Sequence, residues 1–317
     1  MKKKLLPIKD FDLESMNLKN ITKQMKLAGG FMAKNLGIAT DILEEMIKDK
    51  KCLKMISFPA NLIATGTRGI IKELIKRKVF NVVITTSGTL DHDLARIWKN
   101  YYHGSFQAND VELNKLGIHR EGNVFIPKSS YGIILEKKLQ PLFESIYKEK
   151  KELATYELVW EIGKRLEREK KKEESIIYWA WKNKTYVFVP GITDGAFGFQ
   201  LWFFWQNKHK DFNINVLKDE QKLSELLWKK IRTGALILGG GISKHHTIWW
   251  NQFKDGLDYA VYITTALEYD GSLSGAKPEE AISWKKISKK ARTANVICDA
   301  TIALPLMVAS LKERKVI

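Results

Sequence analysis

Three consecutive glycines, residues 239–241, constrain this chain more than any other feature of its sequence. The apolar run before them, 235–238, is typical of a buried strand, and residues 247–253 after them are typical of a helix. Glycines between a strand and a helix let the backbone approach a ligand closely and direct N–H groups at it. The glycines alone fit a flexible turn as well as a ligand-binding turn, so the choice between the two rests on the neighbouring sequence.

The stretch that follows repeats this arrangement. Residues 258–266 form a second apolar run that ends in small hydroxyl-bearing side chains, and 268–276 form a polar loop. We expect a helix over 278–290, which carries Trp284 and Lys286. Two strand–loop–helix units in succession, both rich in reactive side chains, favour a ligand site over a flexible turn.

Strand-like and helix-like stretches alternate along the whole chain. The other predicted strands are residues 53–58, 79–85, 185–189, 212–216 and a last run at 296–300. Long helices are predicted at 38–50 and, as one or two segments with a break near Pro141, at 131–172. This alternation predicts an α/β fold with a doubly wound, mostly parallel, Rossmann-like sheet and helices on both faces. We divide the chain into an N-terminal arm, 1–36, and a single α/β domain, 37–317.

Three aspartates have explanations as helix-terminus residues. Asp91 and Asp93 fall in the first turn of a helix predicted to begin near Leu90, where acids suit the helix dipole. Asp219 is predicted to cap the helix that ends at Lys230. None of the three needs a ligand to explain it.

Composition excludes several classes of protein. The net charge of +17 invites a nucleic-acid partner, but much of the excess lies in mixed Lys/Glu stretches such as 148–172, which are typical of solvated helix faces. We therefore do not expect nucleic acid as a partner. Cys52 and Cys298 have no metal-ligand spacing, which favours a reducing compartment without a metal site. No apolar run approaches the ~20 residues of a membrane span, so we expect a cytoplasmic protein.

In a doubly wound sheet, ligands bind beyond the carboxyl ends of the strands. Small, hydroxylic and acidic residues gather at the predicted ends: Asn61, Thr86, Ser87, Gly88, Asp194, Gly240, Thr265, Asp299 and Ala300. Such groups suit the phosphates, riboses and carboxamide of a nucleotide. The Gly-x-Gly-x-x-Gly fingerprint follows none of the strands, so the residues alone predict only a nucleotide-like ligand.

A few side chains could carry chemistry, although each has an ordinary explanation. Lys286 fits a surface lysine, but an indole such as Trp284 can desolvate an amine and leave it able to attack a carbon–nitrogen double bond. His245 could accept a proton from a substrate amine, or simply begin a helix. Glu280 fits a solvated helix face, and Tyr262 fits the core, but rings near carboxylates also suit a polyamine.

Four motifs, at 239–246, 258–263, 268–272 and 283–287, resemble the deoxyhypusine synthase family in its archaeal form, and the similarity covers about 57–309. The resemblance implies an NAD-dependent transferase. In that family, spermidine is dehydrogenated and its aminobutyl part is held as an imine on an enzyme lysine while 1,3-diaminopropane leaves. The fragment then passes to one lysine of translation initiation factor 5A, where the new imine is reduced.

The resemblance assigns roles to individual positions of this chain. It implies that Lys286 forms the imine and that His245 stands at the spermidine amine. The implied NAD contacts are the strand-end residues named above, and the implied substrate contacts are Asp91, His92, Tyr262, Gly271, Ser272, Glu280 and Trp284. It also implies a homotetramer with active sites at a dimer interface. The stretch 197–205 has six aromatic residues in nine, which favours a subunit interface.

The chain departs from the eukaryotic members at several pocket positions. It has Phe199, His92 and Leu273 where they have acids, and Lys285 where they have glycine. Asp91 is a candidate substitute for one lost carboxylate. These departures leave open a homospermidine synthase-like enzyme that transfers the aminobutyl group to a small amine such as putrescine. A basic RNA- or ribosome-associated binding protein is the alternative from another class.

Overall fold

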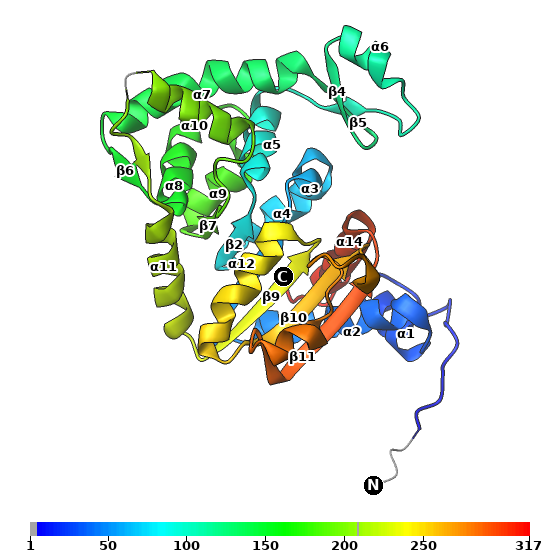
Figure 1. Cartoon of the computed structure of the whole chain (residues 1–317). Helices are drawn as coiled ribbons and strands as arrows, with labels where there is room; N and C mark the ends of the chain where they lie inside the picture. Colours follow the sequence, from blue (N-terminus) through cyan, green and yellow to red (C-terminus); the bar gives the residue numbers. More distant parts are fainter. Residues whose placement is uncertain (1–4, 208) are drawn as a thin grey trace.

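A computed structural model describes residues 5–207 and 209–317. Its central element is a six-stranded sheet in the order β11-β10-β9-β1-β2-β7, in which every neighbouring pair is parallel (Figure 1). The strands are β1 (Cys52–Phe58), β2 (Val82–Thr85), β7 (Tyr186–Phe188), β9 (Arg232–Leu238), β10 (Leu257–Thr264) and β11 (Ile287–Ile297).

Successive residues of a strand point to opposite sides of the sheet, and here apolar side chains lie on both sides. Helices therefore cover both faces. Ile56 and Val261 belong to a core shared with α2 (Phe31–Lys48), α4 (Thr67–Lys76) and α14 (Ala300–Glu313). Their neighbours Met55 and Ala260 belong to a second core, which packs on α11 (Val216–Trp228), α12 (Gly241–Asn251) and α13 (Pro278–Ser283). The predicted doubly wound α/β fold is therefore confirmed.

The long helices predicted near the N-terminus and in mid-chain are present. Helix α2 has 18 residues and begins before the predicted 38–50, so it runs across the boundary drawn at residue 36. Helix α7 (Gly132–Tyr147) continues through Pro141, where we expected a break. Other helices are α5 (Ser87–Trp98), α8 (Thr155–Arg165), α9 (Ile176–Asn183) and α10 (Ala196–Gln206).

Two small sheets lie outside the main one. Strands β3 (Tyr102–His103), β5 (Val124–Pro127) and β4 (Ile118–Glu121) form an antiparallel sheet, which lies with α6 (Asp110–Lys115) at the top right of Figure 1. Strands β6 (Glu152–Leu153) and β8 (Asn213–Ile214) pair with each other. The predicted strand 212–216 is thus shorter than expected and does not belong to the six-stranded sheet.

The predicted helix over 278–290 is wrong in its second half. Helix α13 ends at Ser283, and Lys285 adopts a left-handed φ of 57°. The N–H groups of Lys285 and Lys286 donate to the carbonyls of Ile282 and Ala281, which closes a tight turn, and the long edge strand β11 begins at Ile287. Lys286 therefore lies in a turn that precedes a strand.

Candidate active site

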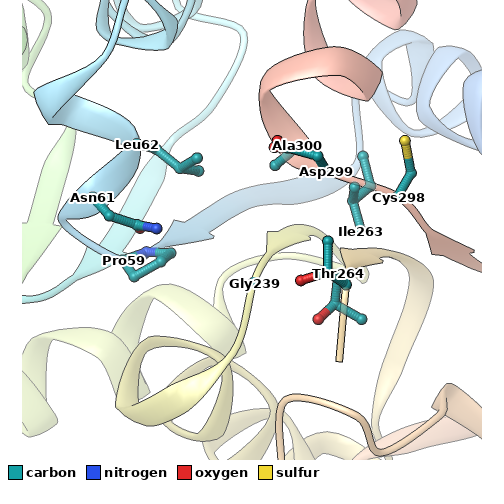
Figure 2. A pocket seen from close by; sticks show the side chains of 10 residues that line it. Pro59, Asn61, Leu62, Gly239, Ile263, Thr264, Cys298, Asp299 and Ala300 are labelled. Atoms are coloured by element: carbon teal, nitrogen blue, oxygen red, sulfur yellow. The ribbon is translucent and has the colours of Figure 1, made fainter. Parts of the chain in front are cut away.

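A cavity of about 260 Å³ lies at the carboxyl edge of the sheet. Figure 2 shows Pro59, Asn61 and Leu62, which follow β1, across from Cys298, Asp299 and Ala300, which follow β11. Gly239, the last two residues of β10 (Ile263 and Thr264) and the following Thr265 complete the lining. Strand β1 has β2, the next strand of the sheet along the chain, on one side and β9 on the other. The strand order therefore reverses direction beside β1, and α/β sheets bind ligands at such a topological switch point.

The glycine turn shapes one side of this cavity. Gly239 and Gly241 have φ of 71° and 63°, which favour glycine. Gly240 has an ordinary negative φ, but a Cβ there would lie 2.0 Å from Oγ of Ser274 and 2.5 Å from its Cα. The loop after β10 therefore packs directly on the glycine turn. This contact accounts for the glycine at position 240 without a ligand.

The other residues predicted to bind the cofactor lie beside β2 and β7. Thr86 is the N-cap of α5, and Ser87 is buried with a hydroxyl that has no partner among the described residues. A Cβ at Gly88 would lie 2.8 Å from Cβ of Ala60, next to Asn61, so the two loops touch. Asp194 is exposed in the loop after β7. The role of these four residues in binding the cofactor stays a prediction.

A second, much smaller cavity of about 30 Å³ has Lys286 in its wall. Lys286 is only 8% exposed, and its ammonium lies 5.1 Å from the ring centroid of Trp284 and 5.5 Å from that of Trp249. The other lining residues are Lys244 and Ile248 of α12, Tyr262 of β10, Leu273, Ala276 and Lys277 of the following loop, and Glu280 and Ala281 of α13. Lys286, Tyr262, Glu280 and Trp284, chosen from sequence, are thus brought together.

His245 stands beside this group. Its ring stacks on Trp249 with the centroids 5.6 Å apart. Partial burial, and then the positive charge of Lys286, lower the pKa of His245. The imidazole is therefore neutral near pH 7 and able to accept a proton. His246 faces away toward Glu220, 3.5 Å distant, and burial lowers its pKa to about 4.

Lys244 is a site residue that the sequence argument did not assign. It is 1% exposed, donates to the carbonyl of Ala276 at 2.7 Å, and lies 4.3 Å from the ring centroid of Tyr262. Burial lowers its pKa to about 8. Its position inside the glycine motif was the one signal that could have indicated it.

Asp91 and His92 lie on α5 and do not line the cavity of Lys286. The carboxylate of Asp91 is buried and accepts hydrogen bonds from the Tyr131 hydroxyl at 2.7 Å and from the N–H groups of Ala196 and Phe197, which begin α10. His92 is hydrogen-bonded to Tyr101, and burial lowers its pKa to about 4. Both have structural partners, and their contact with a substrate stays a prediction.

The predicted substrate contacts Gly271 and Ser272 are exposed in the loop after β10. Gly271 has a φ of 71°, and the N–H of Ser272 donates to the Asp270 carboxylate. The next residue, Leu273, lines the cavity of Lys286. The loop thus reaches the site through Leu273, whereas the roles of the two residues before it stay predictions.

The model of the deoxyhypusine synthase family matches residues 20–311. The chain belongs to this family. Probable deoxyhypusine synthases of Picrophilus torridus and Sulfolobus acidocaldarius are 54% and 47% identical to it over 304 and 306 residues, with 96% of each chain covered. A crystal structure of a putative deoxyhypusine synthase from Entamoeba histolytica has the same fold, with a TM-score of 0.65, 20% identity and 96% of each chain covered.

Family membership confirms several predictions made from sequence. The chain is an enzyme of the transferase class with deoxyhypusine synthase activity, and its resemblance to the archaeal members is confirmed. Among the helices described, none is both long and apolar enough to cross a bilayer.

Proposed function

We propose that the chain transfers the 4-aminobutyl group of spermidine, with NAD as cofactor, to a lysine of the translation initiation factor 5A precursor, forming deoxyhypusine. One observation carries the proposal: Lys286 lies between two indole rings and beside His245, on the same side of the sheet as α12. An amine, a base and aromatic walls in one place are what imine chemistry on a polyamine requires.

The residues at the carboxyl edge fit NAD. The cavity there combines the Asn61 amide, the Thr265 hydroxyl and the Asp299 carboxylate, which can bind carboxamide and ribose groups. The hydroxyl of Ser87, which has no hydrogen-bond partner in the part of the chain that the structure describes, offers a further group beside the loop of Asn61. When bound, NAD would take up the hydride released as spermidine is oxidised to a carbon–nitrogen double bond, and would return it to reduce the imine on the acceptor lysine.

Lys286 and His245 have separate roles: His245 transfers a proton, and Lys286 forms the covalent bond. Neutral His245 takes a proton from the reacting amine of spermidine, and the Lys286 amine attacks the carbon–nitrogen double bond, so that 1,3-diaminopropane leaves. Lys286 is only 8% exposed, and this burial protects the imine held on it from hydrolysis. The imine then passes to the lysine of the acceptor protein.

The polyamine cavity has to open for this reaction. Its volume of about 30 Å³ holds little more than one water molecule. Trp284 is 62% exposed and the loop 273–277 joins two elements, so these parts can move apart to admit a chain of methylene groups. Glu280 is the one carboxylate among the described residues that line the cavity.

A second candidate acceptor, a small amine such as putrescine, is favoured by Leu273. Its side chain lines the cavity at a position where eukaryotic members of the family have an acid. Because the pocket has one carboxylate fewer to pair with an ammonium group, it selects less strictly for spermidine and its protein acceptor. The transfer chemistry on Lys286 would be the same.

One experiment separates these acceptors. The protein is incubated with NAD and spermidine labelled in the aminobutyl part, with either the factor 5A precursor or putrescine present. We expect label on a lysine of the factor. Label on putrescine alone would assign the homospermidine synthase-like reaction, and label on neither would reject aminobutyl transfer.

We also propose that the enzyme is a homotetramer. Phe197 and Phe204 of α10 are buried in the core, but Phe199, Trp202 and Trp205 on the same helix are exposed. Large exposed rings on one helix are typical of a surface that another subunit covers. Light scattering at micromolar concentration tests this, and a monomer would contradict it. The predicted cytoplasmic location remains a prediction.

A further inference from the structure

A buried lysine that the proposed reaction does not use forms part of the polyamine cavity. The ammonium of Lys244 donates to the carbonyl of Ala276 at 2.7 Å, lies 3.5 Å from the carbonyl of Ser274, and sits over the ring of Tyr262. Its side chain is among the largest that are fully buried. Glu280 acts on it only through longer-range charge.

This arrangement is costly for the folded state. A buried ammonium is usually paired with a carboxylate, because two carbonyls and a ring face replace only part of its hydration. Burial accordingly lowers the pKa of Lys244 to about 8. A methionine of similar length would fill the same space without this cost, so stability alone does not explain a lysine here.

The contacts of Lys244 connect the two halves of the site. Lys244 precedes His245 on α12, whereas Ser274 and Ala276 belong to the loop that leads into α13. Helix α13 is followed by the turn that holds Lys286. The same loop also packs on Gly240 through Ser274. The Lys244 ammonium thus fastens the segment that leads to Lys286 onto the helix that carries His245.

We propose that Lys244 is a positioning residue, which sets the separation of His245 and Lys286 by clamping loop 273–277 onto α12. This inference rests on the proposed function. Lys244 is not itself the nucleophile, because its N–H groups are directed at Ala276, Ser274 and Tyr262. Lys286 lies over indole faces in the cavity wall, where its amine is available for reaction.

The test uses Lys244→Met, which keeps the length of the side chain and removes the donors. Single-turnover trapping with borohydride measures aminobutyl imine on Lys286, calorimetry measures NAD binding, and thermal unfolding measures stability. We expect trapping to slow about a hundredfold, as a displacement near 1 Å of reacting groups would do. NAD affinity should stay within about threefold and the melting temperature should stay equal or rise.

Lys254→Met is the matched control. Lys254 follows α12 and also donates to a carbonyl at 2.7 Å, that of Leu227, away from both cavities. Trapping in this variant should stay within about twofold of the parent. If Lys244→Met also traps at the parent rate, or loses activity only in proportion to lost folding, the proposal is wrong. An adduct mapped to Lys244 would likewise overturn it.

Hydrogen exchange without substrates separates this proposal from the proposed function. Amides of residues 273–277 should exchange faster in Lys244→Met than in the parent and the Lys254→Met control. Unchanged exchange would overturn the clamp. If the parent traps no aminobutyl group while the loop exchanges faster in Lys244→Met, the proposed function fails and the clamp stands.

Discussion

The ammonium of Lys286 lies 5.5 Å from the ring centroid of Trp249, on the ring that also stacks with His245. The lysine comes from the turn before β11 and the indole from α12, so the fold brings two distant segments to one aromatic surface. The charge of Lys286 contributes to the lowered pKa of His245. Amine and imidazole are therefore electrostatically coupled across Trp249.

The first prediction concerns the covalent step. Borohydride added during turnover with spermidine and NAD should trap an aminobutyl adduct on Lys286, and Lys286→Ala should abolish transfer. Lys285→Ala is the control, because Lys285 is exposed and does not line the cavity of Lys286. That variant should keep most of the activity. An adduct on Lys285 would contradict the assignment.

The second prediction concerns the protonation of His245. Its pKa lies below the ordinary 6.5 because of burial and the charge of Lys286. The transfer rate should therefore rise with pH as His245 becomes neutral, with a midpoint below 6.5, and then level off. Nuclear magnetic resonance of labelled histidine should show a higher pKa for His245 in Lys286→Met than in the parent, because the variant lacks the neighbouring positive charge. No change in that variant would show that the two groups are uncoupled.

The third prediction concerns stability and follows from Lys244. Its pKa is about 8 in the folded chain and 10.5 when unperturbed. Between these values the unfolded chain keeps a proton that the folded chain has released, so raising the pH stabilises the folded state. The parent should gain up to about 3 kcal/mol relative to Lys244→Met between pH 8 and 10.5. Denaturant unfolding of both proteins measures the difference, and parallel curves would contradict it.

Periodicity identified the buried strands because they are almost continuously apolar, but it missed most of the edge strand β11, which is largely polar and only partly buried. It also could not show what distant side chains do. Asp91 and Asp219 were assigned to their own helices, and both act on others. Asp91 accepts from the start of α10, and Asp219 accepts from the N–H groups of Thr155 and Tyr156 at the start of α8, while Asn215 caps α11. Such caps depend on tertiary contacts that local sequence does not contain.

The candidate site was predictable in its residue types and less so in its geometry. The strand-end rule found Asn61, Thr265 and Asp299, because chain order alone brings the carboxyl ends of parallel strands together. The same rule gave no position for Lys286, which stands at the amino end of β11 and reaches the site from beside α12. Lys244 was missed because only the fold shows that it is buried.

The fourth prediction concerns NAD binding. Asp299 caps α14 by accepting from the N–H of Thr301, so Asp299→Ala would lose a cap worth about 1 kcal/mol as well as a carboxylate. Asp299→Asn keeps the cap and removes only the charge. We expect it to unfold at the parent temperature and to bind NAD about tenfold more weakly. Unchanged NAD affinity by calorimetry would show that the cofactor site has been misplaced.

The last prediction tests the missing acids of the polyamine pocket. Leu273 lines the cavity beside Lys286 and cannot pair with an ammonium group, whereas Glu280 can. A polyamine needs a carboxylate or an aromatic face at each ammonium, and one partly buried charge-assisted contact is worth ~1–3 kcal/mol. The parent should therefore bind spermidine weakly and tolerate amines of other spacing.

Leu273→Asp should restore such a contact and lower the KM for spermidine roughly ten- to hundredfold. Leu273→Asn is the matched control, because it has nearly the same shape and polarity without the charge, and it should leave KM near the parent value. The new carboxylate also faces Lys244 and Lys277, which line the same cavity and could pair with it instead. Measuring KM for spermidine and putrescine in all three proteins separates these outcomes. Equal KM values, together with strict spermidine selectivity in the parent, would mean that Glu280 and the rings already hold the polyamine.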